Sequence, residues 1–83
     1  PPALGEIIYQ DAYGNLVTGL PPRPGRVLAA GGQQFRQART FSDAAPGEAF
    51  WYKNSMGLTE IAVNQGAAAA ILELSTGDAV NWR

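Results

Sequence analysis

Apolar and polar residues alternate over short segments of this chain, and the alternation stops repeatedly at glycine, proline or asparagine. A period of two residues over four to eight positions is typical of β-strands with one buried face. The segments that fit are residues 6–10, 16–20, 27–30, 35–41, 49–53, 58–63 and 79–82. Their short lengths and regular spacing favour a mainly β fold.

Turn signals separate these segments. Residues 11–15 form a turn-rich link between the first two strands, and the Gly-Gly-Gln run at 31–33 marks a second hairpin. Residues 21–25 contain three prolines, which lack the N–H donor of a ladder, so they predict a stiff surface connection. Residues 42–47 are typical of one capped turn that ends at Pro-Gly.

One segment has the period of a helix. Ala67, Ala70, Ile71 and Leu74 recur at the spacing of one helical face, which predicts a short α-helix over residues 65–74, closed by a later glycine. Six to seven strands with one short helix favour a small antiparallel β-barrel.

Length and composition narrow the classes of protein. The 83 residues suffice for a single domain, residues 1–83, with one modest core. A net charge of −1 without clusters of either sign gives no field for a nucleic acid or an anionic membrane. No apolar run approaches the ~20 residues of a membrane span, and the N-terminus lacks the features of a signal peptide. We therefore expect a cytoplasmic protein with neither partner.

The residue types exclude several catalytic arrangements. The chain contains no Cys and no His, which removes Ser–His and Cys–His nucleophiles and the commonest metal ligands, so no metal site is expected. Asp11, Asp43 and Asp78 lie in or beside turns, where carboxylates hydrogen-bond nearby backbone N–H groups, and a structural role is favoured for each.

Aromatic and amide residues leave two interpretations open. Phe50, Trp51 and Tyr52 have the ring area to stack a planar ligand, but strand aromatics are mostly core residues, and this interpretation leads for Trp51. The remaining candidates are amides that suit either a turn or the recognition of a base edge: Asn15, Asn54 and Asn64.

Two stretches resemble a known family. "DAYGNLVTG", from Asp11, is similar to an Asp-x-(Phe/Tyr)-Gly-Asn-x-x-Thr-Asn segment. "NSMGLTEIAVNQGAAAAILELSTGDAV", from Asn54, is similar to Asn-Ser-x-Gly-x-x-Glu-Ile-Ala-x-Asn with its Ala-rich helix and Gly-Asp-x-Val. Both segments belong to the C-terminal β-barrel domain of the S-adenosylmethionine hydroxide adenosyltransferases, which include the fluorinating and chlorinating enzymes. The resemblance spans nearly the whole chain in matching order.

The resemblance implies a domain of an enzyme that converts S-adenosylmethionine and hydroxide to adenosine and L-methionine. S-Adenosylmethionine is then the substrate, and no cofactor is implied. The family's water-activating Asp, Arg and His belong to a separate N-terminal α/β domain, which this chain does not contain. The family binds its substrate between that domain and the C-terminal domain of a neighbour in a homotrimer. We therefore expect no catalytic residue and no activity from this chain alone.

The first motif implies four contact residues. Asp11 matches the carboxylate that receives the methionine ammonium, Tyr13 the aromatic on the adenosyl group, and Asn15 the amide near adenine. Val17 matches a further lining position and is smaller than the aromatic of the fluorinating enzyme. The chain therefore resembles the hydroxide-using branch.

The second motif implies contacts at both ends of one strand. Ser55 and the adjoining backbone of Met56 match the group that binds the methionine carboxylate, and residues 63–65 match the backbone that reads the adenine edge. The residues of this second group are Val63, Asn64 and Gln65, and Phe41 matches a ring-packing aromatic. The implied ligand requires Ser55 and Asn64 to converge on one face with Asp11 and Asn15.

Two other functions remain open on the residues alone. The first is a small oligomerisation or nucleoside-binding module that kept the fold and lost the substrate. The second is a β-domain with no ligand.

Overall fold

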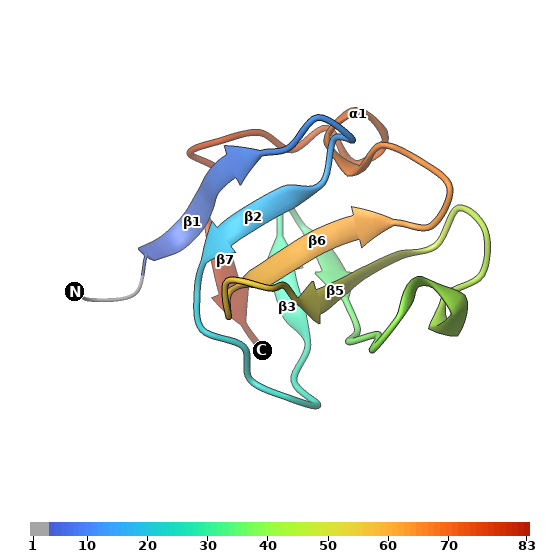
Figure 1. Ribbon diagram of the computed structural model, residues 1–83. Coiled ribbons are helices and arrows are strands. Elements are labelled where there is room, and N and C mark those ends of the chain that lie inside the picture. The colour runs from blue at the N-terminus through green and yellow to red at the C-terminus, as the bar shows by residue number, and fades with distance from the viewer. Residues whose placement is uncertain (1–3) are drawn as a thin grey trace.

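Four antiparallel strands form the larger of two sheets (Figure 1). The structure, a computed structural model, describes residues 4–83 except for the side chain of Phe41. The strands follow the order β1-β2-β6-β5 across the sheet. Their bounds are Leu4–Gln10 for β1, Leu16–Gly19 for β2, Thr59–Val63 for β6 and Ala49–Lys53 for β5. Strand β6 therefore lies inside the sheet, whereas β1 and β5 are its edges.

The smaller sheet has the order β4-β3-β7, with β3 at Leu28–Ala30, β4 at Gln33–Phe35 and β7 at Val80–Trp82. Ala30 pairs with Gln33, so only Gly31 and Gly32 connect β3 to β4. Their φ angles are 59° and 75°, and positive φ at both central residues is what a type I′ turn requires. The two glycines thus set the register of this hairpin.

Isolated bridges join the two sheets at both edges. Gln37 pairs with Trp51 of β5, and Glu6 of β1 pairs with Ala79 just before β7. The Ile7 N–H also donates to the Asp78 carbonyl at 2.9 Å. The mainly β fold with antiparallel strands and one short helix is confirmed, but the predicted closed barrel is not, because the sheets meet through single bridges and not through a continuous ladder.

The main core lies between the two sheets. Trp51 is fully buried there. Its ring packs edge-to-face with the Trp82 ring at 4.9 Å between centroids, and its Nε1 donates to the Arg26 carbonyl at 2.9 Å. The core role predicted for Trp51 is confirmed. The other large members of this core are Ile7, Leu16, Leu28, Phe35, Ile61, Val63, Leu74 and Val80.

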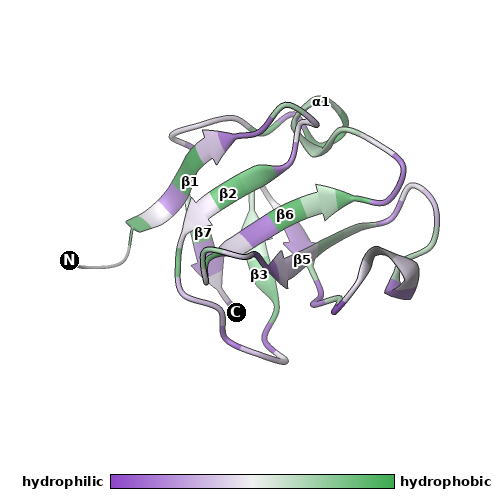
Figure 2. Cartoon of the chain, viewed as in Figure 1, coloured by the Kyte–Doolittle hydropathy of each residue, from purple (hydrophilic) through white to green (hydrophobic). Residues whose placement is uncertain are grey.

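A second, smaller cluster covers part of the other face of the larger sheet. Ala38 and Ala44, from the segment between β4 and β5, pack against Phe50 and Ala62. Strand β6 contains both polar and apolar residues (Figure 2), yet all five of them are buried. Strand β6 is thus covered on both faces.

The strand predicted over residues 35–41 is wrong beyond Phe35. Past this point the chain turns to β5: the Trp51 N–H donates to the Arg36 carbonyl at 3.0 Å, and the Ala38 N–H donates to the Trp51 carbonyl at 2.9 Å. The Asp43 carboxylate then accepts from the backbone N–H groups of residues 39 and 40, and a 3₁₀ turn follows at Phe41–Asp43. Pairing with β5 and this cap therefore replace the expected continuation.

The helix is shorter than predicted, and its buried side differs. Helix α1 spans Ala68–Leu72 and ends at Glu73, which has left-handed backbone angles. Ala68 is its fully buried residue, whereas Ile71 of the predicted stripe is 55% exposed. Gln65 has a φ of 60°, which no helix accommodates, so the helix begins later and presents another face. The described residues hold no helix long and apolar enough to cross a membrane.

Two fully buried threonines give a matched test of packing. Thr59 Oγ1 has no hydrogen-bond partner within residues 4–83, whereas Thr18 Oγ1 donates to the Thr59 carbonyl at 2.8 Å and accepts from the Leu20 N–H at 3.2 Å. Thr59→Val should raise the free energy of unfolding by about 1 kcal/mol, because it removes an unsatisfied hydroxyl. Thr18→Val should lower it by about 1–3 kcal/mol, because it leaves backbone groups unpaired. Urea denaturation measures both, and equal effects of the two changes would contradict this assignment.

Candidate functional site

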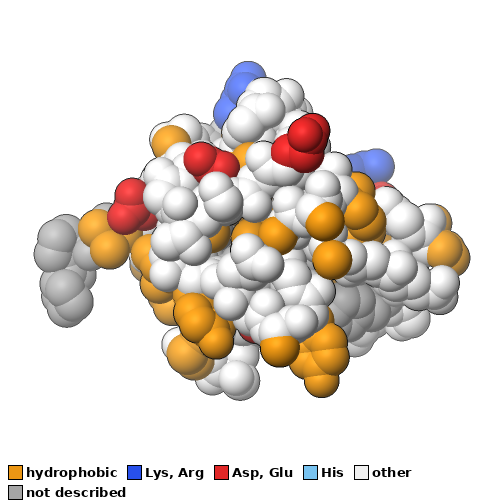
Figure 3. Space-filling view, turned by 90° about the horizontal axis from the view of Figure 1, so that it is seen from above, with side chains coloured by type: hydrophobic (Ala, Val, Ile, Leu, Met, Phe, Trp, Pro, Cys, Tyr) orange, Lys and Arg blue, Asp and Glu red, His pale blue; other side chains and the backbone are white. Residues whose placement is uncertain are grey.

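An open hollow of about 460 Å³ lies at the end of the larger sheet where β2 begins and β6 ends. Its lining comprises Asp11, Tyr13, Asn15, Tyr52, Val63, Gln65 and Gly66. Five of the ten residues that the resemblance implies are among them: Asp11, Tyr13, Asn15, Val63 and Gln65. Figure 3 looks down on the end of the molecule that carries α1 and the β1–β2 turn, where acidic and apolar side chains are interspersed and basic ones appear only at the rim.

Asp11 shapes the turn between β1 and β2. Its Oδ1 accepts from the backbone N–H groups of Tyr13 and Asn15, both at 2.9 Å. This is the structural role predicted for a turn aspartate. Its second oxygen, Oδ2, accepts no hydrogen bond from residues 4–83, so one half of the carboxylate fixes the turn and the other half can receive a cation.

Gly14 fixes this turn against the helix. The Gly14 carbonyl accepts from the Ala69 N–H at 2.9 Å, which satisfies one of the free donors at the start of α1. Gly14 has a φ of 83°, and a Cβ added there would lie 2.8 Å from the Ala67 Cβ. The turn approaches the helix closely because the residue at this position has no side chain.

Other polar groups around the hollow are not used by the fold. Tyr13 is 80% exposed and is one of the residues that line the hollow. In the part of the chain that the structure describes, the side chains of Tyr13, Asn15 and Gln65 make no hydrogen bond. Gln65 has a φ of 60°, a strained conformation for a residue other than glycine and one that is enriched at ligand sites. A carboxylate oxygen, a ring and two amides thus surround one space.

Tyr52 and Gly66 also line the hollow. The sequence raised Tyr52 only as one of three aromatics with the ring area to stack a ligand, and it did not indicate Gly66. Tyr52 donates its hydroxyl hydrogen to Glu60 Oε2 at 2.6 Å. Burial raises the pKa of Tyr52 well above its ordinary value, helped by the bond to Glu60 and by the negative charges of Glu60 and Asp11. Strand alternation could have separated Tyr52 from the core, because it places the Tyr52 side chain on the face of β5 opposite that of Trp51.

Val17 and Asn64 are held by the fold outside the hollow. Val17 is buried within the larger sheet, where it pairs with Tyr9 and with Glu60. The Asn64 side chain donates to the Ala44 carbonyl at 2.8 Å, and its backbone N–H donates to the Glu48 carbonyl at 3.0 Å. Asn64 therefore ties the end of β6 to the segment before β5.

Ser55 and Met56 lie in the turn between β5 and β6, at the opposite end of β6 from Val63. The structure therefore does not bring Ser55 into the hollow beside Asp11 and Asn15. The Met56 N–H donates to Asn54 Oδ1 at 2.9 Å, and the Met56 side chain is 68% exposed. The hydroxyl and N–H of Ser55 are thus the donors that this turn leaves available. Phe41 begins the 3₁₀ turn, and its side chain lies outside the described residues.

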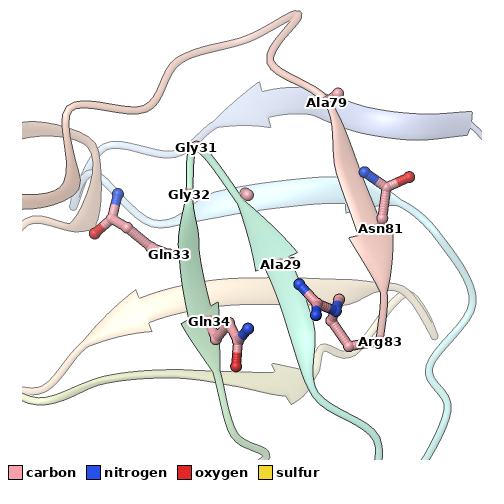
Figure 4. Close-up of a pocket in the computed structure, with 9 residues that line it drawn as sticks. Ala29, Gly31, Gly32, Gln33, Gln34, Ala79, Asn81 and Arg83 are labelled. Atoms are coloured by element: carbon pink, nitrogen blue, oxygen red, sulfur yellow. The ribbon is translucent and has the colours of Figure 1, made fainter.

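A second hollow, of about 280 Å³, lies over the smaller sheet (Figure 4). Gln34, Asn81 and Arg83 project there around Ala29. This hollow contains neither a carboxylate nor a ring, and none of the ten predicted site residues lines it. Within residues 4–83, no three acidic side chains gather closely enough to hold a metal ion. The hollow beside Asp11 is therefore the better candidate site.

The two sheets and the short helix define a small, mainly β domain. The family described as the SAM hydroxide adenosyltransferase C-terminal domain matches residues 5–81, and the chain belongs to this family.

Curated relatives agree with this assignment. An (R)-S-adenosyl-L-methionine hydrolase of Thermus thermophilus is 38% identical over 74 residues, which cover 88% of this chain and 29% of that protein. A protein of the same name from Salinispora arenicola is 36% identical over 81 residues, covering 88% and 30%. The chain thus spans less than a third of the length of these relatives.

Solved structures share the fold over the whole chain. A conserved hypothetical protein from Thermus thermophilus matches with a TM-score of 0.91 and 35% identity, covering 100% of this chain and 38% of that one. An uncharacterized conserved protein from Thermotoga maritima matches with a TM-score of 0.81 and 27% identity, covering 99% and 37%. In both, the shared fold is one part of a longer chain.

The surroundings of Tyr52 predict a pH dependence. Because its pKa is raised in the folded state, the neutral phenol stabilises the fold; this contribution is fully present below pH 10 and is lost as the pH rises towards the folded pKa. An ultraviolet titration should show one tyrosine that ionises later than free tyrosine, and Tyr52→Phe should remove that late step. Uniform ionisation of all tyrosines near pH 10 would contradict the assignment.

Proposed function

We propose that this domain supplies part of a binding site for S-adenosylmethionine in an enzyme that hydrolyses it to adenosine and L-methionine. One observation carries the proposal: the hollow gathers Asp11, Tyr13 and Asn15 with Gln65, which lies far from them in the sequence. The names of the curated relatives support the same substrate.

Asp11 is the proposed partner of the methionine ammonium. Its Oδ1 is occupied by the turn, which holds the carboxylate in one orientation and leaves Oδ2 for a charge-assisted hydrogen bond. The methionine carboxylate is bonded to the same carbon as the ammonium, so its proposed donors, the hydroxyl and N–H of Ser55, must approach Asp11 in the assembled site. Because Asn54 holds the Met56 N–H, Met56 contributes to this contact only through its position in the turn.

The adenosine end of the ligand is assigned to the hollow. The exposed Tyr13 ring offers a stacking face, and the Asn15 amide offers both a donor and an acceptor to the base edge. Gln65 adds the backbone groups of a strained turn, beside Val63. Adenine is uncharged, so amides and a ring suffice to recognise it.

The chemical step is assigned to a partner domain. In the proposed reaction, hydroxide attacks C5′ of the ribose and methionine leaves, and the groups that activate water come from the N-terminal α/β domain that the family resemblance implies. This chain has no His. We therefore propose that it is inactive alone and completes the site in a homotrimer of the full-length enzyme.

A second candidate is an oligomerisation module that retained the fold without the ligand. The observation in its favour is the edge strand β1, on which Leu4, Ile8 and Tyr9 are exposed large hydrophobic residues. Exposed apolar side chains on an edge strand suit contact with another domain or subunit. The two candidates share this surface and differ in whether the hollow binds a ligand.

Asp11→Asn tests the assignment of the ammonium. The variant keeps Oδ1 as the acceptor of the turn but removes the charge, so binding of S-adenosylmethionine should weaken about ten- to a hundredfold, as expected for about 1.5–3 kcal/mol from a charged hydrogen bond. Adenosine has no ammonium, and its affinity should stay within about twofold. Calorimetry at millimolar ligand measures both.

Several outcomes would count against the proposal. Equal losses for both ligands would mean that the Asp11→Asn change disturbs the turn, and the ammonium assignment would fail. No binding of either ligand by the unaltered chain would favour the oligomerisation module. Release of adenosine and methionine by the chain alone would overturn its proposed inactivity.

A further inference from the structure

Glu60 is a buried carboxylate at the centre of the larger sheet. The register places it between Val17 of β2 and Tyr52 of β5, and Val17 in turn pairs with Tyr9 of β1. These four residues form one row across the sheet, on the face opposite the main core. Glu60 is only 5% exposed.

Two hydrogen bonds compensate this burial. Glu60 Oε2 accepts from the Tyr52 hydroxyl at 2.6 Å, and Oε1 accepts from Asn54 Nδ2 at 3.1 Å. No Lys or Arg within residues 4–83 forms an ion pair with it. A buried carboxylate without a cation is costly, so these two donors are strongly held in place.

Asn54 passes this constraint to the β5–β6 turn. Its Oδ1 accepts from the N–H groups of Met56 and Leu58, both at 2.9 Å, while its Nδ2 points to Glu60. A flipped amide would set an oxygen against the carboxylate and an NH₂ group against two N–H donors. Glu60 therefore selects the one amide orientation that closes the turn around Ser55.

We infer that Glu60 is a positioning residue: it ties Tyr52, in the wall of the hollow, to the turn that carries Ser55, and so fixes the position of Ser55 relative to the hollow. The inference rests on the proposed function, since that function assigns Ser55 to the methionine carboxylate, and Asp11 and the rest of the hollow to the ammonium and the adenosine. Glu60 itself does not line the hollow.

The acid is suited to this task because it only accepts hydrogen bonds. Each oxygen of an ionised carboxylate can receive a donor, whereas a glutamine offers one oxygen and one NH₂ group. After Glu60→Gln, the new side chain could still accept from Asn54 and donate to the Tyr52 oxygen, so this variant should preserve most of the link. Glu60→Ala would remove this acceptor from both the Tyr52 hydroxyl and the Asn54 amide.

The test compares Glu60→Ala and Glu60→Gln with Glu6→Gln, an exposed control on β1. Amide hydrogen exchange by NMR reports the turn without any ligand. In Glu60→Ala, exchange at Met56 and Leu58 should accelerate at least tenfold while Ile61 and Val63 stay protected. Glu60→Gln should restore most of the protection, and Glu6→Gln should change nothing.

Ligand binding provides the second measurement. Glu60→Ala should weaken S-adenosylmethionine at least tenfold and adenosine less, because the turn is assigned to the methionine end. Unchanged exchange at Met56 and Leu58 would overturn the inference. If Glu60→Ala does not fold, Glu60→Met fills the same space without a carboxylate acceptor, and unchanged exchange at Met56 and Leu58 in that variant would overturn the inference.

The two proposals fail in different ways. If the unaltered chain binds neither ligand, the proposed function is wrong, and the exchange result alone then supports or overturns the link between Glu60 and the turn. If the unaltered chain binds and Glu60→Ala binds equally well, the proposed function stands and the positioning role is wrong.

Discussion

The burial of β6 on both faces is the constraint on which the rest of the structure depends. Ile61 and Val63 face the main core between the sheets, while Ala62 faces the second cluster and Glu60 the row with Tyr52. A domain of this size can bury only a modest core, so a strand that is buried on both faces stabilises the fold through both hydrophobic clusters. The strand also places the two turns at its ends at a defined distance from each other.

This arrangement separates stability from recognition. The inner face of the larger sheet and the smaller sheet supply the packing, with Trp51 at the centre. The hollow lies beside the β1–β2 turn, whose backbone is fixed by Asp11 and Gly14, and the β5–β6 turn at the other end of β6 is fixed by Asn54. The family assignment fits this division, since the matched domain is a part of longer proteins that complete a site around it.

Local pattern predicted most of the strands, and tertiary contacts decided the rest. Alternation and turn residues located β1, β2, β5, β6 and the core role of Trp51, because these depend on period and turn chemistry. The strand expected over residues 35–41 ended early because of pairing with β5, which no local pattern encodes. The apolar face predicted for α1 was wrong because Gln65 and Glu73 adopt positive φ, and their residue types do not predict this conformation.

For the candidate site, too, local motifs predicted part of the structure and tertiary contacts determined the rest. Half of the site residues that the family motifs implied line the hollow. Three of these, Asp11, Tyr13 and Asn15, share one turn and were therefore predicted together. The pairing of Tyr52 with Glu60 could not be predicted, because it depends on which strands become neighbours and on what covers them. The most direct measurement is an NMR titration of the chain with S-adenosylmethionine. The account predicts shifts in the amides of residues 11–15, 54–58 and 65–66; shifts confined to the hollow beside Ala29, or none at saturating ligand, would contradict it.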